Sequence, residues 1–299
     1  MTPALDARAL GKRFRRAWGL RDCTLTIPQG AIVGLAGPNA AGKSTLLALA
    51  AGLLAPTEGS IAVLGCDPLR EPSVLADVGF VPQGAPLYRS FTVGQAIEFA
   101  RRTNPRWDAM IVASVLGRLG ARTKVGALSA AERTQLALAL VLGKRPRLLL
   151  LDEPFGGLDP FARREFLKLL MDGVAETSAT VVIASHVMAE IERVCDDIVL
   201  LAGGSVRLEG RVESLLESHR ILMGPRRPIG TIRGVREIVR ERHSDRQLTL
   251  LVLSDGPIVD PSWTVERVGL EELLLAYLAP PERLQPPKPP ERLPLQWHG

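Results

Sequence analysis

The sequence is poor in cysteine and contains no long apolar run. Its three cysteines, Cys23, Cys66 and Cys195, are scattered over 299 residues without CxxC spacing. This usage argues against a disulfide framework and a zinc site, and it fits reduced thiols that fill the core of a cytoplasmic protein. No apolar stretch reaches the roughly 20 residues that span a bilayer, and the start, MTPALDARALGKRF, lacks the apolar core of a signal peptide. If a membrane is involved, we expect another chain to span it.

Charge of one sign is not concentrated in any part of the chain. The net charge is +5, but the arginines are spread along the sequence. The densest cluster, GKRFRR at residues 11–16, lacks the interleaved aromatic pattern of a nucleic-acid platform, so we interpret it as a solvated face and expect no nucleic-acid partner. Apolar residues at 46% and charged residues at 23% are ordinary globular usage and argue against disorder or a fibrous fold.

Short β-rich apolar runs alternate with helical patterns from residue 5 to about residue 210, as in AIVGLAG followed by KSTLLALAAGLL. This alternation predicts an α/β fold with a mostly parallel sheet covered by helices on both faces. Residues 86–143 show three helical patterns and no such strand, which indicates a helical insertion. After residue 210, RILMGPR and QLTLLVLS look like strands and GLEELLLAYLA looks like a closing helix.

These patterns divide the chain into parts of different style. We expect an α/β domain over residues 1–218, including a helical subdomain at about 86–143, and a small α+β accessory domain over 219–279. The last segment, residues 280–299, is too rich in proline for a helix or sheet, and we expect an extended, mobile tail.

A phosphate-binding loop is predicted where a strand pattern meets a helix pattern. Residues 37–44, GPNAAGKS, match GxxxxGK[ST] directly after AIVGLA and before STLLALAAGLL. The glycines let the backbone curl so that successive N–H groups point inward, and the helix N-terminus adds its positive dipole end. Lys43 would reach the β and γ phosphates, and the Ser44 hydroxyl would ligate Mg²⁺. The nucleotide contacts expected here are Gly37, Pro38, Asn39, Ala40, Ala41, Gly42, Lys43, Ser44 and Thr45.

Two acids end a continuous leucine run, RLLLLDE, at Asp152 and Glu153. Such a run is typical of a buried parallel strand whose carboxyl end opens onto a ligand crevice. Asp152 is placed to hold Mg²⁺, and Glu153 to orient or deprotonate the water that attacks the γ-phosphate. The alternative, a polar strand terminus, is less favoured because the phosphate-binding loop lies upstream.

The order and spacing of these motifs resemble those of ATP-binding-cassette (ABC) transporter ATPases over residues 5–210, which implies a P-loop NTPase core. The resemblance implies that Phe14, with Trp18 as the rival, stacks on adenine. It also implies that Gln83 of VGFVPQ contacts Mg²⁺ or the attacking water, and that His186 contacts the γ-phosphate. We expect the other histidines, His219, His243 and His298, to lie on the surface.

Two more motifs of the family act across a dimer of cassettes. The resemblance implies that Asp159 of GGLD reaches across the interface, and that the loop at residues 128–132 presses against the γ-phosphate of the opposite subunit. Here that loop reads LSAAE where the family has LSGGQ. Ser129 remains, but Ala131 and its neighbour add methyl groups where glycines permit close approach. We infer a weakened signature, with two interpretations open: pairing with an unlike cassette, or a tolerated change in a homodimer.

The resemblance implies an ATPase that uses ATP and Mg²⁺ and drives transport through separate polytopic permease subunits beside a second cassette. We therefore expect it at the cytoplasmic face of the membrane, held by the membrane subunits, and in the cytoplasm when alone. The segments PLYRSFTV and NPRWD and the strand-rich end look most like ATPases of bacterial ABC-2-type exporters, including antibiotic-export systems.

Two alternatives to transport remain. A soluble, non-transport ABC ATPase would carry two cassettes or long coiled coils, and the chain has one copy of each motif and no such coils. A poorly hydrolysing nucleotide-dependent regulator is suggested by the altered signature, although the retained Glu153 and His186 argue against it. The ATP site does not encode the transported substrate or the direction of transport.

Overall fold

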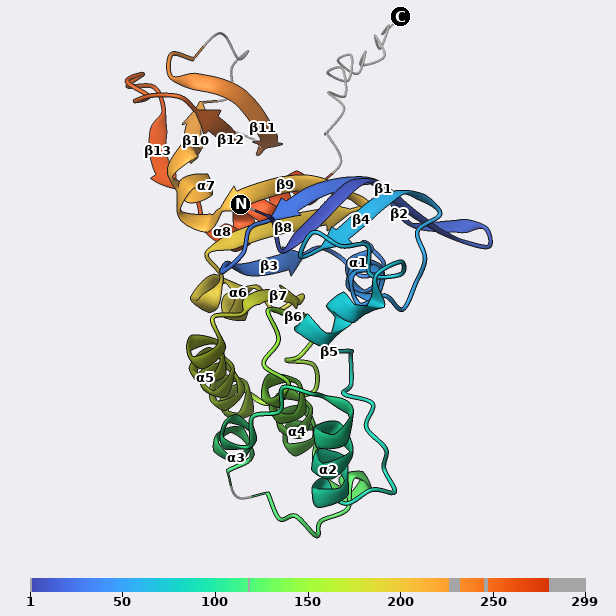
Figure 1. The fold of residues 1–299 in the computed structure, drawn as a ribbon. Coiled ribbons are helices and arrows are strands. Elements are labelled where there is room, and N and C mark those ends of the chain that lie inside the picture. The colour runs from blue at the N-terminus through green and yellow to red at the C-terminus, as the bar shows by residue number, and fades with distance from the viewer. Residues whose placement is uncertain (1, 118, 226–231, 245–246, 280–299) are drawn as a thin grey trace, which may run out of the picture.

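The centre of the molecule is a six-stranded sheet in which every neighbouring pair is parallel except the last (Figure 1). The computed structural model describes residues 2–117, 119–225, 232–244 and 247–279. The strands, in spatial order, are β5 (Val78–Val81), β6 (Leu148–Asp152), β7 (Thr180–Ala184), β3 (Ile32–Ala36), β8 (Asp197–Ala202) and β9 (Ser205–Arg211). Strands β3, β6 and β7 are buried along their whole length, which explains their unbroken apolar sequences. The predicted α/β class is confirmed.

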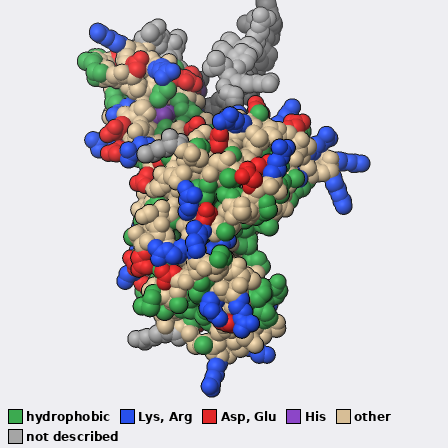
Figure 2. All heavy atoms as spheres, viewed as in Figure 1, with side chains coloured by type: hydrophobic (Ala, Val, Ile, Leu, Met, Phe, Trp, Pro, Cys, Tyr) green, Lys and Arg blue, Asp and Glu red, His purple; other side chains and the backbone are tan. Residues whose placement is uncertain are grey.

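A second, antiparallel sheet was not expected from the sequence. It has the order β2-β1-β4 and consists of β1 (Leu5–Phe14), β2 (Ala17–Ile27) and β4 (Glu58–Val63). Its apolar residues share one core cluster with strand β3 and helix α1 (Lys43–Ala50). The β1–β2 turn projects from the body, and Figure 2 shows Lys and Arg side chains gathered at that end. The cationic GKRFRR stretch is therefore largely exposed to solvent.

The helical insertion and the C-terminal accessory domain lie at opposite ends of the molecule (Figure 1). It contains α2 (Val93–Thr103), α3 (Ala109–Leu116) and α4 (Ala130–Gly143), with short 3-10 turns η1 (Pro72–Asp77) before it and η2 (Val125–Ala127) within it. Each α-helix begins at a side-chain cap, at Thr92, Asp108 and Ser129. The flanking helices of the central sheet are α5 (Pro160–Thr177) and α6 (Met188–Val194).

The C-terminal part forms a four-stranded antiparallel sheet with the order β11-β12-β10-β13. Its elements are α7 (Val212–Ser218), β10 (His219–Pro225), β11 (Val235–His243), β12 (Gln247–Ser254), β13 (Thr264–Arg267) and α8 (Leu270–Leu278). The predicted strands β10 and β12 and the predicted closing helix are present, whereas β11 and β13 were not expected. Helix α8 also packs on the core of the α/β domain through Leu270 and Leu274. The boundary at residue 218 stays a prediction, and the proline-rich tail lies outside the described residues.

The prediction that His219 lies on the surface is wrong. His219 is 1% exposed, and its ring is held by the Leu215 carbonyl at Nδ1, 2.7 Å, and by the Tyr277 hydroxyl at Nε2, 2.9 Å. Its burial depends on packing against α8, which lies far away in sequence. His243 is exposed as expected, and His298 lies outside the described residues.

The three cysteines are free thiols, as their scattered spacing in the sequence predicts. Cys23 and Cys195 are buried and Cys66 is half-buried, all as free thiols. Burial raises the pKa of the Cys23 thiol to about 11 and that of Cys195 to about 12, so both stay protonated.

Within the described ranges, no helix combines the length and the apolar character needed to cross a bilayer.

Candidate nucleotide-binding site

The loop between β3 and α1 has a backbone that requires glycine at two positions. Gly37 and Gly42 have φ values of +147° and +109°. A Cβ on Gly37 would lie 2.3 Å from the Leu201 carbonyl oxygen, and one on Gly42 would lie 2.5 Å from the Gly19 carbonyl oxygen. Helix α1 starts at Gly42 with no side-chain cap, so its first N–H groups are free to bind an anion. The cradle therefore fits a phosphate group.

Ala40 lies in the same loop with a φ of +63°, a conformation that costs an alanine about 1 kcal/mol. This strain gives a physical reason for the glycine that the family often has at this position. The loop keeps its shape because Gly37 and Gly42 are retained.

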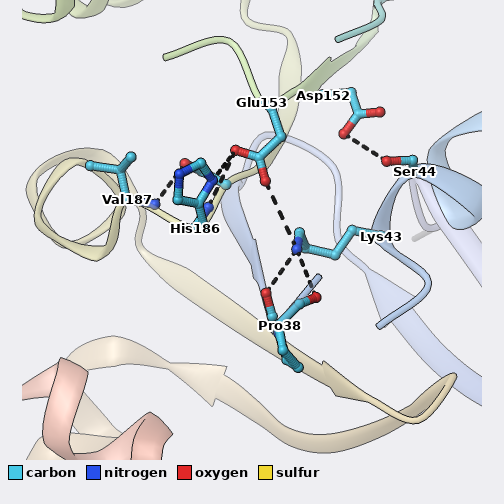
Figure 3. Close-up of polar contacts among 9 residues, drawn as sticks. Pro38, Lys43, Ser44, Asp152, Glu153, His186 and Val187 are labelled. Atoms are coloured by element: carbon cyan, nitrogen blue, oxygen red, sulfur yellow. Dashed lines mark hydrogen bonds and ion pairs between the residues drawn. The ribbon is translucent and has the colours of Figure 1, made fainter. Parts of the chain in front are cut away.

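Lys43 is buried, 6% exposed, and its ammonium group lies between the loop at Pro38 and the carboxylate of Glu153 (Figure 3). It donates hydrogen bonds to the carbonyl oxygens of Gly37, 2.7 Å, and Pro38, 3.2 Å. The same nitrogen lies 3.9 Å from Oε1 of Glu153. A buried cation held only by neutral carbonyls and one carboxylate favours a further anion nearby.

Glu153 lies between Lys43 and His186 (Figure 3). Its Oε2 is 2.7 Å from Nδ1 of His186, while its Oε1 faces Lys43. The residue has a φ of +47°, and its backbone N–H donates to the Ala184 carbonyl at the end of β7. This left-handed conformation is unusual for a residue with a side chain and is characteristic of functional sites. Glu153 is 9% exposed, and its carboxylate is held in place by its contacts with Lys43 and His186.

Asp152 and Ser44 face each other beside this group. The Ser44 hydroxyl donates to Oδ1 of Asp152 at 3.1 Å. Desolvation raises the pKa of the Asp152 carboxyl, and the hydrogen bond from Ser44 opposes that shift. A hydroxyl and a carboxylate are the hard oxygen ligands that Mg²⁺ prefers, so the pair fits this ion.

Lys43, Ser44 and Glu153 open onto a cavity of about 380 Å³. Besides residues 39–45 of the loop, which include Asn39, Ala41 and Thr45, its lining residues are Phe14, Ala17, Trp18, Gly19, Gln83 and Glu153. Both aromatic candidates therefore line the cavity. A Cβ on Gly19 would lie 2.8 Å from Cε2 of Phe14, so glycine here leaves room for the Phe14 ring. Ala17 and Gly19 were missed because no motif marks them.

Seven predicted residues do not line this cavity. Four of them, Gly37, Pro38, Asp152 and His186, lie next to residues that do, and the other three belong to separate elements. Ser129 and Ala131 lie at the start of α4, and the exposed Asp159 caps α5 by accepting hydrogen bonds from the N–H groups of Phe161 and Ala162, both 2.9 Å. Their roles toward a nucleotide stay predictions.

Comparison with known proteins agrees with this geometry. The family profile described as "ABC transporter" matches residues 20–156. The chain is 32% identical over 217 residues to the ABC transporter ATP-binding protein YtrB of Bacillus subtilis (strain 168), covering 72% of this chain and 74% of the relative. The chain belongs to the ABC transporter family of ATP-binding proteins. As an ABC ATPase, it uses ATP with Mg²⁺.

Relatives of this ABC ATPase include both importers and exporters by name. It is 36% identical over 224 residues to the Nod factor export ATP-binding protein I of Rhizobium leguminosarum bv. viciae, covering 72% of each chain. It is 34% identical over 216 residues to the sulfate/thiosulfate import ATP-binding protein CysA of Synechocystis sp. (strain ATCC 27184 / PCC 6803 / Kazusa), covering 70% of this chain and 61% of the relative. A solved ATP-binding subunit of an ABC transporter, 25% identical, matches with a TM-score of 0.64 over 72% of this chain and 92% of its own.

Proposed function

We propose that this ABC ATPase hydrolyses ATP with Glu153 as the catalytic base and powers a bacterial ABC-2-type exporter. The observation that supports catalysis most directly is the carboxylate of Glu153, which is fixed between Lys43 and His186 at the mouth of the phosphate cradle. A carboxylate so oriented can accept a proton from an attacking water. Likeness to a Nod factor export protein supports the exporter assignment.

We assign roles to the other residues that are consistent with their positions. ATP supplies the phosphoryl group, and bound Mg²⁺ neutralises its charge. The backbone of residues 37–42 and the N-terminus of α1 hold the phosphates, and Lys43 turns from its carbonyl partners toward them. His186 holds Glu153 and is exposed enough to reach the γ-phosphate, since its side chain is 62% exposed. Ser44, Asp152 and Gln83 would hold the metal ion.

A test of Glu153 separates binding from hydrolysis. Glu153→Gln keeps the size of the side chain but removes the base, so steady-state ATPase activity should fall at least a hundredfold while ATP affinity changes less than fivefold. Glu176→Gln, an exposed change at the end of α5, should leave both unchanged. Normal turnover by a folded Glu153→Gln protein would remove Glu153 from the mechanism.

We also propose that the permease binds an aromatic groove between the helical insertion and the core. The groove has a volume of about 420 Å³ and contains Tyr88, Phe91 and Phe99. These rings form one cluster, with centroids 5.1 to 6.2 Å apart, yet Tyr88 is 67% exposed and Phe99 51%. Exposed aromatic clusters are typical of protein interfaces. Part of the groove wall, residues 86–91, follows Gln83 closely in sequence, so a membrane subunit seated there would contact the segment that leads to the nucleotide.

The proposed docking of the permease in this groove leads to a separate prediction. Phe99→Arg places a charge on an exposed ring position, so the protein should fold and hydrolyse ATP but be lost from membranes that contain its permease. Met110→Arg, on an 80% exposed residue outside the groove, serves as the control. Sedimentation of both variants with native membranes measures the difference. Equal recovery of Phe99→Arg and wild type would rule out this docking site.

A further inference from the structure

A larger cavity lies in the C-terminal part, away from the nucleotide. Helix α8 covers only part of one face of the four-stranded sheet, and the uncovered part is a cavity of about 760 Å³. Its apolar wall includes Ile221 of β10, Leu251 of β12 and Leu275 of α8. Leu275 is 54% exposed. The volume is in the range of small-molecule sites, and no lining residue is shared with the nucleotide cavity.

The charged residues of this cavity are not equally solvated. Arg240 and Arg242 line it from β11, and Glu271 and Glu272 line it from the first turn of α8. Both glutamates and Arg242 are exposed, whereas Arg240 is half-buried. The Arg240 Nε is shielded from water and meets no acceptor, and among the described residues no ion pair joins Arg240 to a carboxylate.

Arg240 is therefore a half-buried charge of the cavity wall that has no carboxylate partner among the described residues. Water solvates the two glutamates, but a half-buried guanidinium with an unmet N–H favours an anion beside it. A carboxylate binds the guanidinium group of arginine through two N–H groups, and Arg240 lines the cavity without a carboxylate partner among the described residues. The aliphatic wall next to Arg240 would bury an apolar chain.

We propose that this cavity binds a small amphipathic anion, with its acid group on Arg240 and its aliphatic part against Leu251 and Leu275. The proposal is independent of the ATPase function, because the two cavities share no residue. A ligand at this place would join β11 to α8, and α8 packs on the ATPase core through Leu270 and Leu274.

Decanoate is a suitable probe. Calorimetric titration of the full chain should show one saturable site, and Arg240→Gln should weaken binding at least tenfold. The matched control is Arg236→Gln, on the same strand but exposed and outside the cavity, which should bind within twofold of wild type. Decyltrimethylammonium, with the same chain and a positive head, should bind at least tenfold more weakly than decanoate.

A second variant keeps the test decisive if Arg240→Gln does not fold. Leu275→Asp alters an exposed side chain on the apolar wall, so the fold should persist while the added charge abolishes decanoate binding. Absence of saturable decanoate binding to wild type would overturn the proposal. So would undiminished binding to folded Arg240→Gln or Leu275→Asp, or tighter binding of the cationic amphiphile. Mg-ATP titration of the same samples would show whether the nucleotide site is intact in each case.

Discussion

The altered signature carries a charged residue, Glu132, where the family has a neutral glutamine. Its Oε2 accepts hydrogen bonds from both the backbone N–H and the hydroxyl of Ser129, each 2.8 Å. These bonds lower the pKa of the carboxyl, so Glu132 is ionised at neutral pH. The Ser129 hydroxyl is thus engaged within its own chain and lies beside a negative charge. We propose that this arrangement disfavours a γ-phosphate brought to it by a second cassette.

This proposal predicts that Glu132→Gln raises the ATPase rate of the purified chain roughly tenfold, a change of about 1.4 kcal/mol, because it removes like-charge repulsion. Glutamine still completes the capping box, so stability should be nearly unchanged. Combining it with glycine at positions 130 and 131 should add to the gain, since the methyl groups are removed. Fast turnover of wild type that none of these changes improves would mean that the signature works as it stands.

At the scale of elements, the histidine at the start of β10 links the accessory sheet to α8. Burial lowers the pKa of His219, although the Leu215 carbonyl opposes the shift. Since Nδ1 lies against a carbonyl, it carries the proton, and Nε2 accepts the Tyr277 hydroxyl hydrogen. The neutral ring is therefore the form that the fold accommodates.

The lowered pKa has a definite consequence for stability. The unfolded chain binds a proton more readily than the fold does, so the contribution of His219 is complete above its ordinary pKa, 6.5, and declines as the pH falls below it. The free energy of unfolding of wild type should therefore fall more steeply between pH 6.5 and pH 5 than that of His219→Gln. Urea unfolding at several pH values measures both slopes; equal slopes would show that His219 does not titrate in this way.

Burial of His219 was beyond sequence reasoning because its partner, Tyr277, lies 58 residues away. Contiguous motifs fared better. The phosphate cradle is a single loop whose glycines determine its own backbone, and Glu153 directly follows a buried strand, so their sequence alone indicated their place. Phe14 reaches the cavity only through the pairing of β1 with β2, and Gly19 has no motif at all. Strands β11 and β13 are rich in exposed side chains and lack a clear apolar alternation, which explains why they were missed.

At the scale of the whole molecule, the nucleotide cavity and the groove proposed to bind the permease lie in different places. The nucleotide cavity lies at the carboxyl ends of β3 and β6, and the aromatic groove lies beside the helical insertion. Gln83 lies in sequence between two parts of the groove wall, strand β5 and residues 86–91, and it also lines the nucleotide cavity. A change at the phosphates therefore has a short covalent route to the surface that we assign to the permease.

Hydrolysis and transport both require that the cradle around Lys43 binds Mg-ATP. Calorimetric titration of the full chain with Mg-ATP should give saturable binding at micromolar to submillimolar concentration. Lys43→Ala should weaken it at least tenfold while the protein stays folded, because the β and γ phosphates lose their buried cation. A folded wild-type chain that releases no binding heat with Mg-ATP, or a Lys43→Ala variant that binds equally well, would contradict the account.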